Sequence, residues 1–354
     1  MRVATLTFQS ALNYGAVLQA YALREAIRSL GHKCDVLNYK CPAIEKSYRY
    51  FSSPVTPKGI ASGLVNYGER HRRKVVFGDF ARTCLCLGEP LGPSEVAATA
   101  MRYDAFVVGS DQVWNPKLTG GDAAYYLSFA KGKKRISYAA SAGNGLDDLL
   151  SNEDVLAAIG RLDHVAVRES DLASSLAPKV GKEVFTVVDP VFLVGRDKWT
   201  DVAVHVAKGE PYILAYGLHE PSVYATAESM ARKHRLRCLY VPQGRKTKCS
   251  GTKVIAPSVE EFLGYIKDAS AVVTDSFHVA SFSLIFGRPL LVQLKTKNVG
   301  MNSRITTLME SAGVADKVIM PQDDIPDIDY ASAWNLLDCC RGTSLAWLEK
   351  SLHE

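Results

Sequence analysis

Five consecutive residues, Thr274-Asp275-Ser276-Phe277-His278, combine side chains that could bind an anion and transfer a proton. They follow an apolar run, 271–273, which predicts a buried strand of a parallel sheet. Thr, Asp and Ser favour helix N-caps and turns, and the helix expected next runs over 278–286 and ends at Gly287. Parallel α/β sheets bind ligands at such turns, where free N–H groups and the helix dipole favour phosphate or carboxylate. His278 adds a group that exchanges protons near neutral pH, although a capped helix with a packed or solvated histidine would share this pattern.

Four other expected strands end in small or polar residues. Because the carboxyl ends of parallel strands meet at one edge of a sheet, we expect these side chains to converge. Asp111 could act as a base or as a turn residue, and Asn13 and Tyr14 could bind a sugar or form a structural loop. Asp189, which precedes a proline, is expected to form a turn. The four strand ends are Asn13-Tyr14-Gly15, Gly109-Ser110-Asp111, Arg168-Glu169-Ser170 and Asp189.

The elements that position these groups begin with a strand, a loop, a helix and a second strand. Apolar residues spaced by three and four from Ala16 to Leu30 predict the helix, and Gly31 ends it. No G-x-G-x-x-G motif follows the first strand, which argues against a dinucleotide site. The expected strands are 3–8, 34–39, 103–108, 136–140, 164–167 and 184–188 in the first half, and 212–216, 236–241, 271–273 and 290–294 in the second.

This alternation of strands and helices predicts an α/β fold of two Rossmann-like domains with an interdomain cleft, as in GT-B glycosyltransferases. The domains are expected to be residues 1–195 and 196–354. Prolines interrupt residues 42–100, so we expect an irregular excursion there. The C-terminal segment, 331–352, is expected to be helical and is a candidate to pack back across the joint.

Composition places the chain among ordinary soluble enzymes, with 354 residues, 47% hydrophobic and 22% charged. No apolar run reaches the length of a membrane span, and the N-terminus predicts a strand rather than a signal peptide. We therefore expect a cytoplasmic protein whose eight cysteines are reduced thiols. Their spacings match no metal signature, so no metal site is expected.

Positive charge is concentrated between residues 40 and 74. Eight Lys and Arg there face only Glu45 and Glu69, which leaves a local charge of eight minus two, +6, in a chain of net charge +5. The cluster is either a solvated helix surface or a contact for an anionic partner, such as lipid headgroups at the inner face of a membrane or a pyrophosphate-linked acceptor. No nucleic-acid-binding signature accompanies it, so nucleic acid is not an expected partner.

Five blocks of the chain, taken in order, resemble the bacterial polysaccharide pyruvyl transferases. The similar region runs from residue 5 to about residue 310. The resemblance implies a GT-B-like pair of domains and an enzyme that uses phosphoenolpyruvate to place a pyruvate ketal on two hydroxyls of a sugar. Its acceptor would belong to a polymeric or lipid-linked cell-surface glycan, and no cofactor is implied beyond phosphoenolpyruvate as co-substrate. The blocks are Asn13-Tyr14-Gly15-Ala16, Gly109-Ser110-Asp111-Gln112-Val113-Trp114-Asn115, Val167-Arg168-Glu169, Val188-Asp189-Pro190 and Thr274-Asp275-Ser276-Phe277-His278.

The resemblance also assigns donor-binding residues. Arg168 matches a family arginine that follows a strand and contacts the donor, although an ion pair with a neighbouring acid is the alternative. His278 matches the histidine of the second domain, but several family members have arginine two positions earlier, where this chain has Ser276. A donor with a phosphate and a carboxylate needs more than one cation, so Arg304 or Arg288 is expected to supply the second, Arg304 being better placed.

The implied chemistry needs specific groups. Phosphoenolpyruvate reacts at C2 once C3 is protonated, so the site requires a proton donor, cations for both anionic groups and a base for each attacking hydroxyl. His278 is the candidate acid or, alternatively, a clamp for the phosphate, and Asp111 or Asp275 is the candidate base. Trp114 is expected to pack in the domain core. The candidates on the acceptor side are Asn13, Tyr14, Gly15 and Ser110.

Two other functions are compatible with the pattern. A nucleotide-sugar glycosyltransferase would use the same cleft and helix terminus for a diphosphate donor. A non-catalytic glycan-binding protein with a decayed donor site would tolerate serine at position 276. Thermal-shift screening separates the three, since phosphoenolpyruvate, a nucleotide sugar or neither should stabilise the protein.

Overall fold

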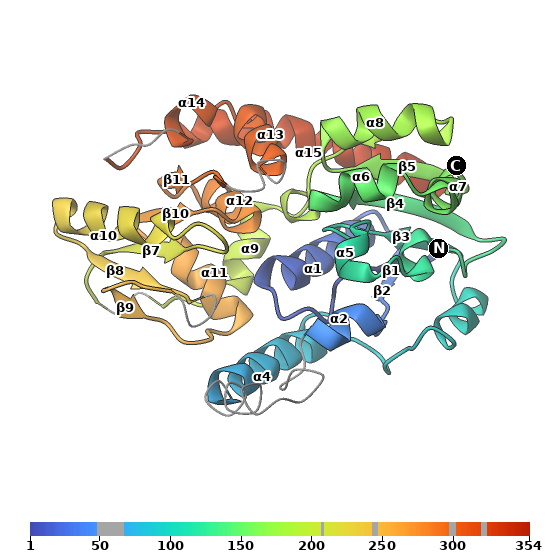
Figure 1. Ribbon diagram of the computed structural model, residues 1–354, viewed down its shortest axis with the longest axis horizontal. Helices are drawn as coiled ribbons and strands as arrows, with labels where there is room; N and C mark the ends of the chain where they lie inside the picture. Colours follow the sequence, from blue (N-terminus) through green and yellow to red (C-terminus); the bar gives the residue numbers. More distant parts are fainter. Residues whose placement is uncertain (48–66, 207–208, 243–246, 297–301, 320–323) are drawn as a thin grey trace. The chain divides into compact units, whose positions relative to one another are not determined.

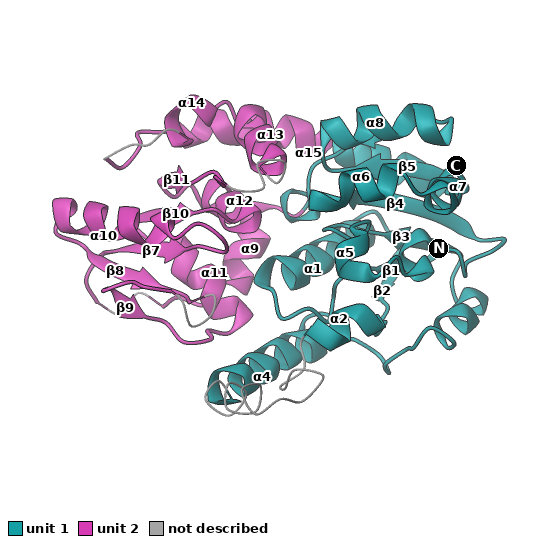
Figure 2. Ribbon diagram, viewed as in Figure 1, with its two compact units in different colours: residues 1–193, 343–354 teal, residues 194–342 magenta. Residues whose placement is uncertain are grey.

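The computed structural model describes residues 1–47, 67–206, 209–242, 247–296, 302–319 and 324–354. The chain divides into two compact units, one formed by Met1–Leu193 with Thr343–Glu354 and the other by Val194–Gly342 (Figure 2). The first unit therefore ends two residues before the expected boundary and also contains the last residues of the chain. Leu348 and Leu352 explain this assignment, because both are fully buried in an apolar cluster with Val3 and Leu23.

The described part of unit 1 is built on a six-stranded parallel sheet with the order β2-β1-β3-β4-β5-β6 (Figure 1). Successive residues of β3 alternate between two apolar clusters, Phe106 and Val108 in one and Ala105 and Val107 in the other, so both faces of the sheet are covered. The strands are β1 (Arg2–Leu6), β2 (Lys33–Val36), β3 (Ala105–Val108), β4 (Lys134–Ala140), β5 (His164–Val167) and β6 (Phe185–Thr186).

The helices of unit 1 bury apolar residues on this sheet. Leu23 and Ile27 of α1 lie in the same cluster as Ala105 and Val107, whereas Trp114, which is fully buried as expected, lies in the opposite one. Among the described residues up to Leu193, the α-helices are α1 (Tyr14–Ser29), α2 (Pro42–Ser47), α4 (Tyr67–Thr83), α5 (Pro116–Thr119), α6 (Leu146–Leu150), α7 (Glu153–Gly160) and α8 (Ser170–Val180).

Helix α4 lies within the excursion that was expected to be irregular. It packs against α1 through ring contacts, with Phe77 at 4.8 Å from Tyr14 and Phe80 at 6.1 Å from Tyr21, measured between ring centroids. The prolines of the excursion lie outside these 17 residues, so they do not interrupt the helix.

Unit 2 contains, among its described residues, a five-stranded parallel sheet with the order β11-β10-β7-β8-β9. Ile213 and Ala215 of β7 pack with α10, and Tyr216 contacts Phe262 of α11 on the other face, at 5.1 Å between ring centroids (Figure 1). The strands are β7 (Tyr212–Tyr216), β8 (Arg237–Tyr240), β9 (Thr252–Lys253), β10 (Ala271–Thr274) and β11 (Leu290–Val292). The described helices of unit 2 are α9 (Arg196–Val202), α10 (Ser222–His234), α11 (Val259–Lys267), α12 (Phe277–Phe286), α13 (Ser303–Ser311) and α14 (Ala315–Val318). Helix α15 (Tyr330–His353) begins in unit 2 and continues into unit 1 at Thr343.

Helix α12 occupies the interior of unit 2. Nine of its ten residues are buried, and His278 is the one that is partly exposed. Gly287 ends the helix at φ 63°, a left-handed conformation that glycine adopts without strain, as the sequence predicted. Among the described residues, no helix has the length and apolar character needed to cross a membrane.

Candidate active site

The turn after β10 has the local structure that its residue types predicted. The Ser276 hydroxyl caps α12 by accepting a hydrogen bond from the Val279 amide at 3.5 Å. The Thr274 hydroxyl donates to the Tyr216 carbonyl at 2.7 Å and accepts from the Ser276 amide at 3.0 Å. These bonds fix the first turn of α12, so His278 is held at the N-terminal end of the helix, where the dipole favours negative charge.

Asp275 organises the neighbouring loop instead of facing a substrate. Its carboxylate accepts three backbone N–H bonds, from Leu218 at 2.6 Å, His219 at 2.7 Å and Glu220 at 3.0 Å. Both carboxylate oxygens are therefore engaged by the loop that follows β7. Because these bonds occupy the carboxylate, the expectation that Asp275 could be the base is corrected. Asp275 instead positions the loop that follows β7.

Lys295 and Arg304 bring positive charge to the same edge of the sheet. Lys295 follows β11, and the Asn302 side chain brackets its backbone, accepting from the Lys295 amide at 2.9 Å and donating to its carbonyl at 3.0 Å. Asn302 directly precedes α13, the helix that carries Arg304. These two hydrogen bonds hold the segment after β11 against the start of α13, and each of the two segments carries one cation.

The charges of these cations affect the pKa values of neighbouring groups. Burial, and then the charge of Arg304, lower the pKa of Lys295 to about 8, against the opposing influence of Asp275 and Glu220. Burial and then the charge of Lys295 also lower the pKa of His219. The positive groups are therefore crowded at the ends of β7, β10 and β11, an arrangement that an anion would relieve.

Arg288 lies elsewhere. It follows α12, whose ten residues span about 15 Å, so it lies at the opposite end of the helix from His278. Its guanidinium donates to the Phe286 carbonyl at 3.3 Å, and its own carbonyl accepts from the Tyr330 hydroxyl at 2.6 Å. Of the two arginines expected to bind the donor, Arg304 is near Lys295 and Arg288 is not.

Three of the four predicted strand ends of unit 1, those at Ser110, Arg168 and Asp189, converge into a buried network. Asp189 accepts from the Ser110 hydroxyl at 2.9 Å and from the Arg168 guanidinium at 2.8 Å, and it caps the turn at Val191, as expected. Arg168 also pairs with Glu169 at 3.3 Å. Burial lowers the pKa of Arg168, but the carboxylates Glu169, Asp189 and Asp111 outweigh this effect and raise it overall.

This burial corrects two expectations. The Arg168 side chain is only 3% exposed, so its guanidinium holds strand ends together and does not present a surface to the donor. Ser110 is fully buried and donates to the Asp189 carboxylate, which leaves its hydroxyl inaccessible to an acceptor. Asp111 is partly exposed beside this network, and its charge acts on Arg168.

The predicted acceptor loop at residues 13–15 has a structural role in this fold. Asn13 caps α1 by accepting from the Ala16 amide at 3.2 Å. Tyr14 is 2% exposed with its ring against Phe77, and Gly15 is buried in the first turn of α1. The ring of Tyr14 is therefore occupied by protein contacts, which corresponds to the structural alternative considered for this loop.

Sequence reasoning missed Lys295, His219 and Asn302. A signal existed for Lys295, because it directly follows the expected strand 290–294 at the carboxyl edge of the sheet. Asn302 carries no such signal, since its function depends on the fold bringing it to Lys295. Among the described residues, no group of three or more His, Cys, Asp or Glu side chains comes together as a metal ion would require.

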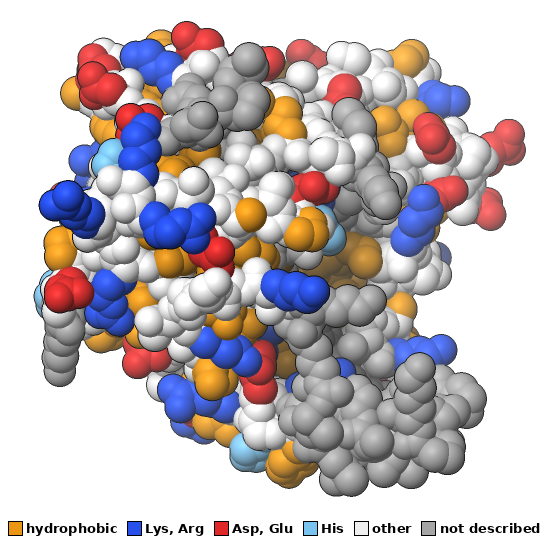
Figure 3. Space-filling model, turned by 60° about the vertical axis from the view of Figure 1, so that its left-hand side comes forward, with side chains coloured by type: hydrophobic (Ala, Val, Ile, Leu, Met, Phe, Trp, Pro, Cys, Tyr) orange, Lys and Arg blue, Asp and Glu red, His pale blue; other side chains and the backbone are white. Residues whose placement is uncertain are grey.

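The basic cluster at 40–74 lies partly outside the described residues, which exclude 48–66 and with them Arg49 and Lys58. On α4, Arg70 and Arg72 are exposed, whereas Arg73 donates to the Leu12 carbonyl at 2.7 Å. On the face drawn in Figure 3, Lys and Arg side chains stand in small groups with Asp and Glu between them. The exposed pair on α4, Arg70 and Arg72, is therefore the part of the cluster whose binding to an anionic surface can be tested.

Comparison with protein families gives one match. A sequence model of the family described as "Polysaccharide pyruvyl transferase" matches residues 13–292, most of the chain. Among curated proteins, no sequence relative matches it.

Solved structures share the fold at low sequence identity. The chain is similar to the UDP-GlcNAc 2-epimerase of Neisseria meningitidis bound to UDP-GlcNAc, with a TM-score of 0.53, 11% identity and coverage of 99% of each chain. It is also similar to the UDP-GlcNAc 2-epimerase of Methanocaldococcus jannaschii (TM-score 0.51, 11% identity, 96% of this chain and 92% of that one). An alpha-glucosyltransferase in complex with UDP-glucose and DNA containing an abasic site gives a TM-score of 0.50 at 7% identity, covering 99% of this chain and 92% of its own. These likenesses show a GT-B fold of two Rossmann-like domains, as the sequence predicted.

Proposed function

The chain belongs to the polysaccharide pyruvyl transferase family, and we propose that it moves the pyruvyl group of phosphoenolpyruvate onto two hydroxyls of a sugar. The acceptor would be part of a cell-surface glycan or of its lipid-linked precursor, and the reaction would take place in the cytoplasm. The observation that supports this donor is the pair of cations Lys295 and Arg304 at the carboxyl edge of the unit 2 sheet, the edge at which α12 begins with His278 in its first turn.

The donor and this cation group match in charge. Phosphoenolpyruvate carries a phosphate and a carboxylate, and Arg304 offers a planar fork suited to either group. Lys295 is 6% exposed and its surroundings lower its pKa to about 8, so an anion beside it would favour the charged form. Lys295 and Arg304 would together supply the second cation that is needed because position 276 is a serine instead of an arginine.

The proposed reaction keeps its protons in balance. C3 of phosphoenolpyruvate gains a proton, one sugar hydroxyl adds to C2, the C2–O bond to phosphate breaks, and the second hydroxyl closes the ketal. Of the two hydroxyl protons released, one is balanced by the new methyl group and the other by the leaving phosphate. His278, at the start of α12, is the proposed proton donor to C3, and Asp111 the proposed base for a sugar hydroxyl.

A nucleotide-sugar glycosyltransferase is the second candidate, because structures of the same fold contain UDP-GlcNAc or UDP-glucose. The cations at the end of β10 would bind a diphosphate as well as a phosphate. A glycan-binding protein with a decayed donor site would have no need for a buried lysine beside an arginine, which argues against that alternative.

Transfer itself is the test. Incubation with phosphoenolpyruvate and a panel of glycoside acceptors should release one phosphate per modified acceptor and increase its mass by a pyruvylidene group. The His278→Gln variant should lower turnover by roughly a hundredfold or more, while His353→Gln, at the exposed chain end, should match the wild type. Sugar transfer from a nucleotide donor with no pyruvylidene gain on any acceptor would establish the glycosyltransferase instead.

A further inference from the structure

Two cysteines of unit 2 lie side by side although they are 11 positions apart in the chain. The Sγ atoms of Cys238 and Cys249 are 3.9 Å apart, and both residues are free thiols. Cys238 is the second residue of β8, and Cys249 lies in the segment that leads into β9. The sulfur atoms of a disulfide are about 2.05 Å apart, so a movement of about 2 Å would allow this pair to form one.

The backbone around the pair holds the two thiols together. Gly251 packs so closely on Cys238 that a Cβ atom at position 251 would lie 2.5 Å from the Cys238 carbonyl oxygen and 3.0 Å from its Sγ. Strands β8 and β9 pair directly, and the Ser250 amide donates to the Glu228 carboxylate of α10. These contacts hold the segment before β9 against β8 and α10, which keeps Cys249 within reach of Cys238.

An oxidant can reach both thiols. Cys238 and Cys249 are each partly exposed, in contrast to Cys34 and Cys41, which are buried in unit 1. Both also pack against the apolar cluster of α10 and β7, a contact that two small apolar side chains would make for the fold alone. The short sulfur–sulfur distance together with the exposure is what favours a disulfide over packing alone.

Cys249 is the thiol suited to react first. Burial raises the pKa of both thiols, and the pKa of Cys238 reaches about 12. For Cys249, hydrogen bonds from the Gly251 backbone and from the Cys238 thiol oppose this effect of burial on the pKa. Because the thiolate is the reactive form, we expect Cys249 to attack an oxidant and Cys238 to complete the disulfide. The raised pKa values also mean that oxidation requires an abundant oxidant.

The segment before Cys249 contacts the loop after β7. Thr247 forms a hydrogen bond with the Tyr224 hydroxyl. The same hydroxyl donates to the Gly217 carbonyl at 2.8 Å and accepts from the Gly217 amide at 3.2 Å. Gly217 directly precedes the loop whose three amides bind Asp275. A restraint at Cys249 would therefore reach, through Tyr224, the loop at the candidate active site.

We propose that Cys238 and Cys249 form a reversible disulfide when a hydroperoxide is abundant, and that this bond restrains the segment before β9 and the loop after β7. The Cys249 thiolate attacks the O–O bond of hydrogen peroxide, which gives a sulfenic acid on Cys249 and releases one water. The Cys238 thiol then attacks this sulfur, so that the S–S bond forms and a second water leaves. The two thiols lose two electrons and two protons in total, and the peroxide is reduced to two molecules of water.

Peptide mapping of the full chain tests the disulfide. The protein is treated with millimolar hydrogen peroxide, its remaining thiols are blocked with N-ethylmaleimide, and it is cleaved with trypsin. Peptides 238–245 and 249–253 should be joined, with a mass about 2 Da below the sum of the two free peptides, and dithiothreitol should separate them. The oxidised chain should run as a monomer on a non-reducing gel. In Cys238→Ser, dimedone should label a sulfenic acid on Cys249.

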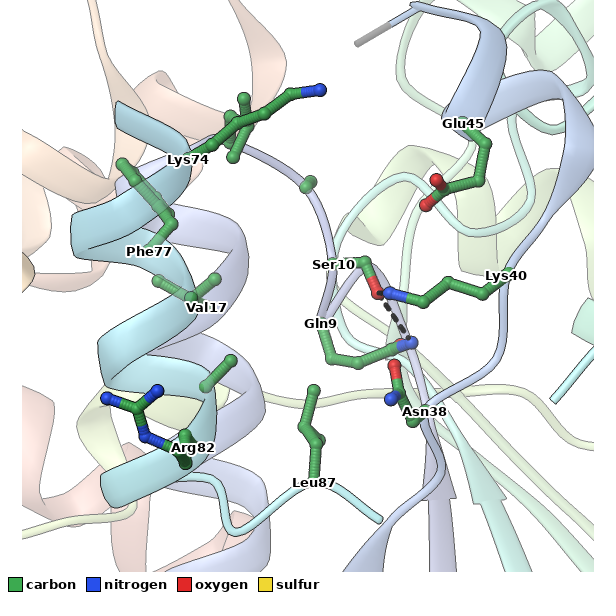
Figure 4. A pocket seen from close by; sticks show the side chains of 14 residues that line it. Gln9, Ser10, Val17, Asn38, Lys40, Glu45, Lys74, Phe77, Arg82 and Leu87 are labelled. Carbon is green, nitrogen blue, oxygen red and sulfur yellow. Dashed lines mark hydrogen bonds between the residues drawn. The ribbon is translucent and has the colours of Figure 1, made fainter. Parts of the chain in front are cut away.

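Cys86→Ser is the matched control. Cys86 is exposed and directly precedes Leu87, which lines the pocket of unit 1 shown in Figure 4. Removal of this thiol should leave the joined peptide unchanged, whereas Cys238→Ser and Cys249→Ser should each abolish it. Oxidation of Cys86 in the wild type without any joined peptide would overturn the disulfide assignment.

Hydrogen exchange tests the restraint. In the oxidised wild type, the amides of residues 218–220 should exchange more slowly than in the reduced protein, because the new bond limits opening of the loops. Peroxide treatment of Cys249→Ser should leave this exchange unchanged. Equal exchange in the two forms of the wild type would contradict the link to the loop after β7. Neither measurement uses phosphoenolpyruvate, so both results are independent of the proposed function.

Discussion

Replacing Lys295 by methionine should stabilise the protein and weaken donor binding at the same time. Methionine keeps the length of the buried side chain but removes the ammonium, which is 6% exposed and lies near Arg304. A lysine that served only the fold would show the opposite result, a loss of stability without any change in ligand binding. Measuring both stability and donor binding therefore distinguishes a lysine whose charge serves ligand binding from a lysine whose charge serves the fold.

The stability effect follows from the pKa. Burial first, and Arg304 second, lower the pKa of Lys295 from 10.5 to about 8. Since the unfolded chain holds this proton more tightly than the folded one, charged Lys295 opposes folding below pH 8, and the cost vanishes as the pH rises past 10.5. The shift corresponds to ~3 kcal/mol, which is the upper limit for the gain of Lys295→Met at pH 7.

The binding effect has the opposite sign. Loss of a charge-assisted hydrogen bond to an anion should reduce phosphoenolpyruvate affinity by roughly 10- to 100-fold. In the wild type, affinity should also fall as the pH rises above the lysine pKa, because the ammonium is lost. Lys295→Arg should remove this pH dependence, since arginine keeps its charge.

Urea denaturation at pH 7, 9 and 10.5 measures the first effect, and calorimetry with phosphoenolpyruvate measures the second. The free energy of unfolding should be higher for Lys295→Met at pH 7, and the difference should shrink toward pH 10.5. Lys317→Met, at an exposed position of α14, is the matched control and should change neither quantity. Lower stability of Lys295→Met at pH 7 combined with unchanged donor affinity would refute the reasoning.

Two further predictions concern unit 1. Arg168→Lys should lower the free energy of unfolding by ~1–3 kcal/mol, because one ammonium cannot pair with both Asp189 and Glu169. The KM for phosphoenolpyruvate should stay unchanged. A raised KM in a variant of unchanged stability would instead indicate that Arg168 binds the donor. Neutralising Arg70 and Arg72, the exposed basic pair of α4, should weaken binding to anionic vesicles in a salt-sensitive way, by about 1 kcal/mol per residue. Equal vesicle sedimentation of the double variant and the wild type would make this pair an ordinary solvated surface.

Local rules predicted the strand–turn–helix unit at residues 271–287 well. The apolar run, the Ser276 cap and Gly287 define α12 from sequence alone, because each depends on residues within one strand–turn–helix unit. The convergence of strand ends in unit 1 was also predictable, since parallel strands share a carboxyl edge. Family likeness added His278, which no local rule could distinguish from a packed histidine.

Burial was the quantity that sequence could not supply. Arg168 follows a strand at the expected edge, but the acids that neutralise it are 1 and 21 residues away, and only the fold makes both of them its partners. The same applies to Asp275, whose three amide donors come from the loop after β7. Residue type and position gave the location of both side chains, whereas their roles depended on long-range contacts.

The serine at position 276 can be understood from these contacts. An arginine there would bring a cation from the turn itself, but this chain uses the position for the hydroxyl that caps α12. Lys295 compensates from the end of the adjacent strand, because β11 pairs directly with β10 and Asn302 clamps the residue in place. Burial and the charge of Arg304 lower the pKa of Lys295 to about 8, and the proposed function gives these two neighbouring cations the role of binding a donor with two acidic groups. Under the proposed function, the missing arginine therefore corresponds to a cation moved to another position of the same sheet edge.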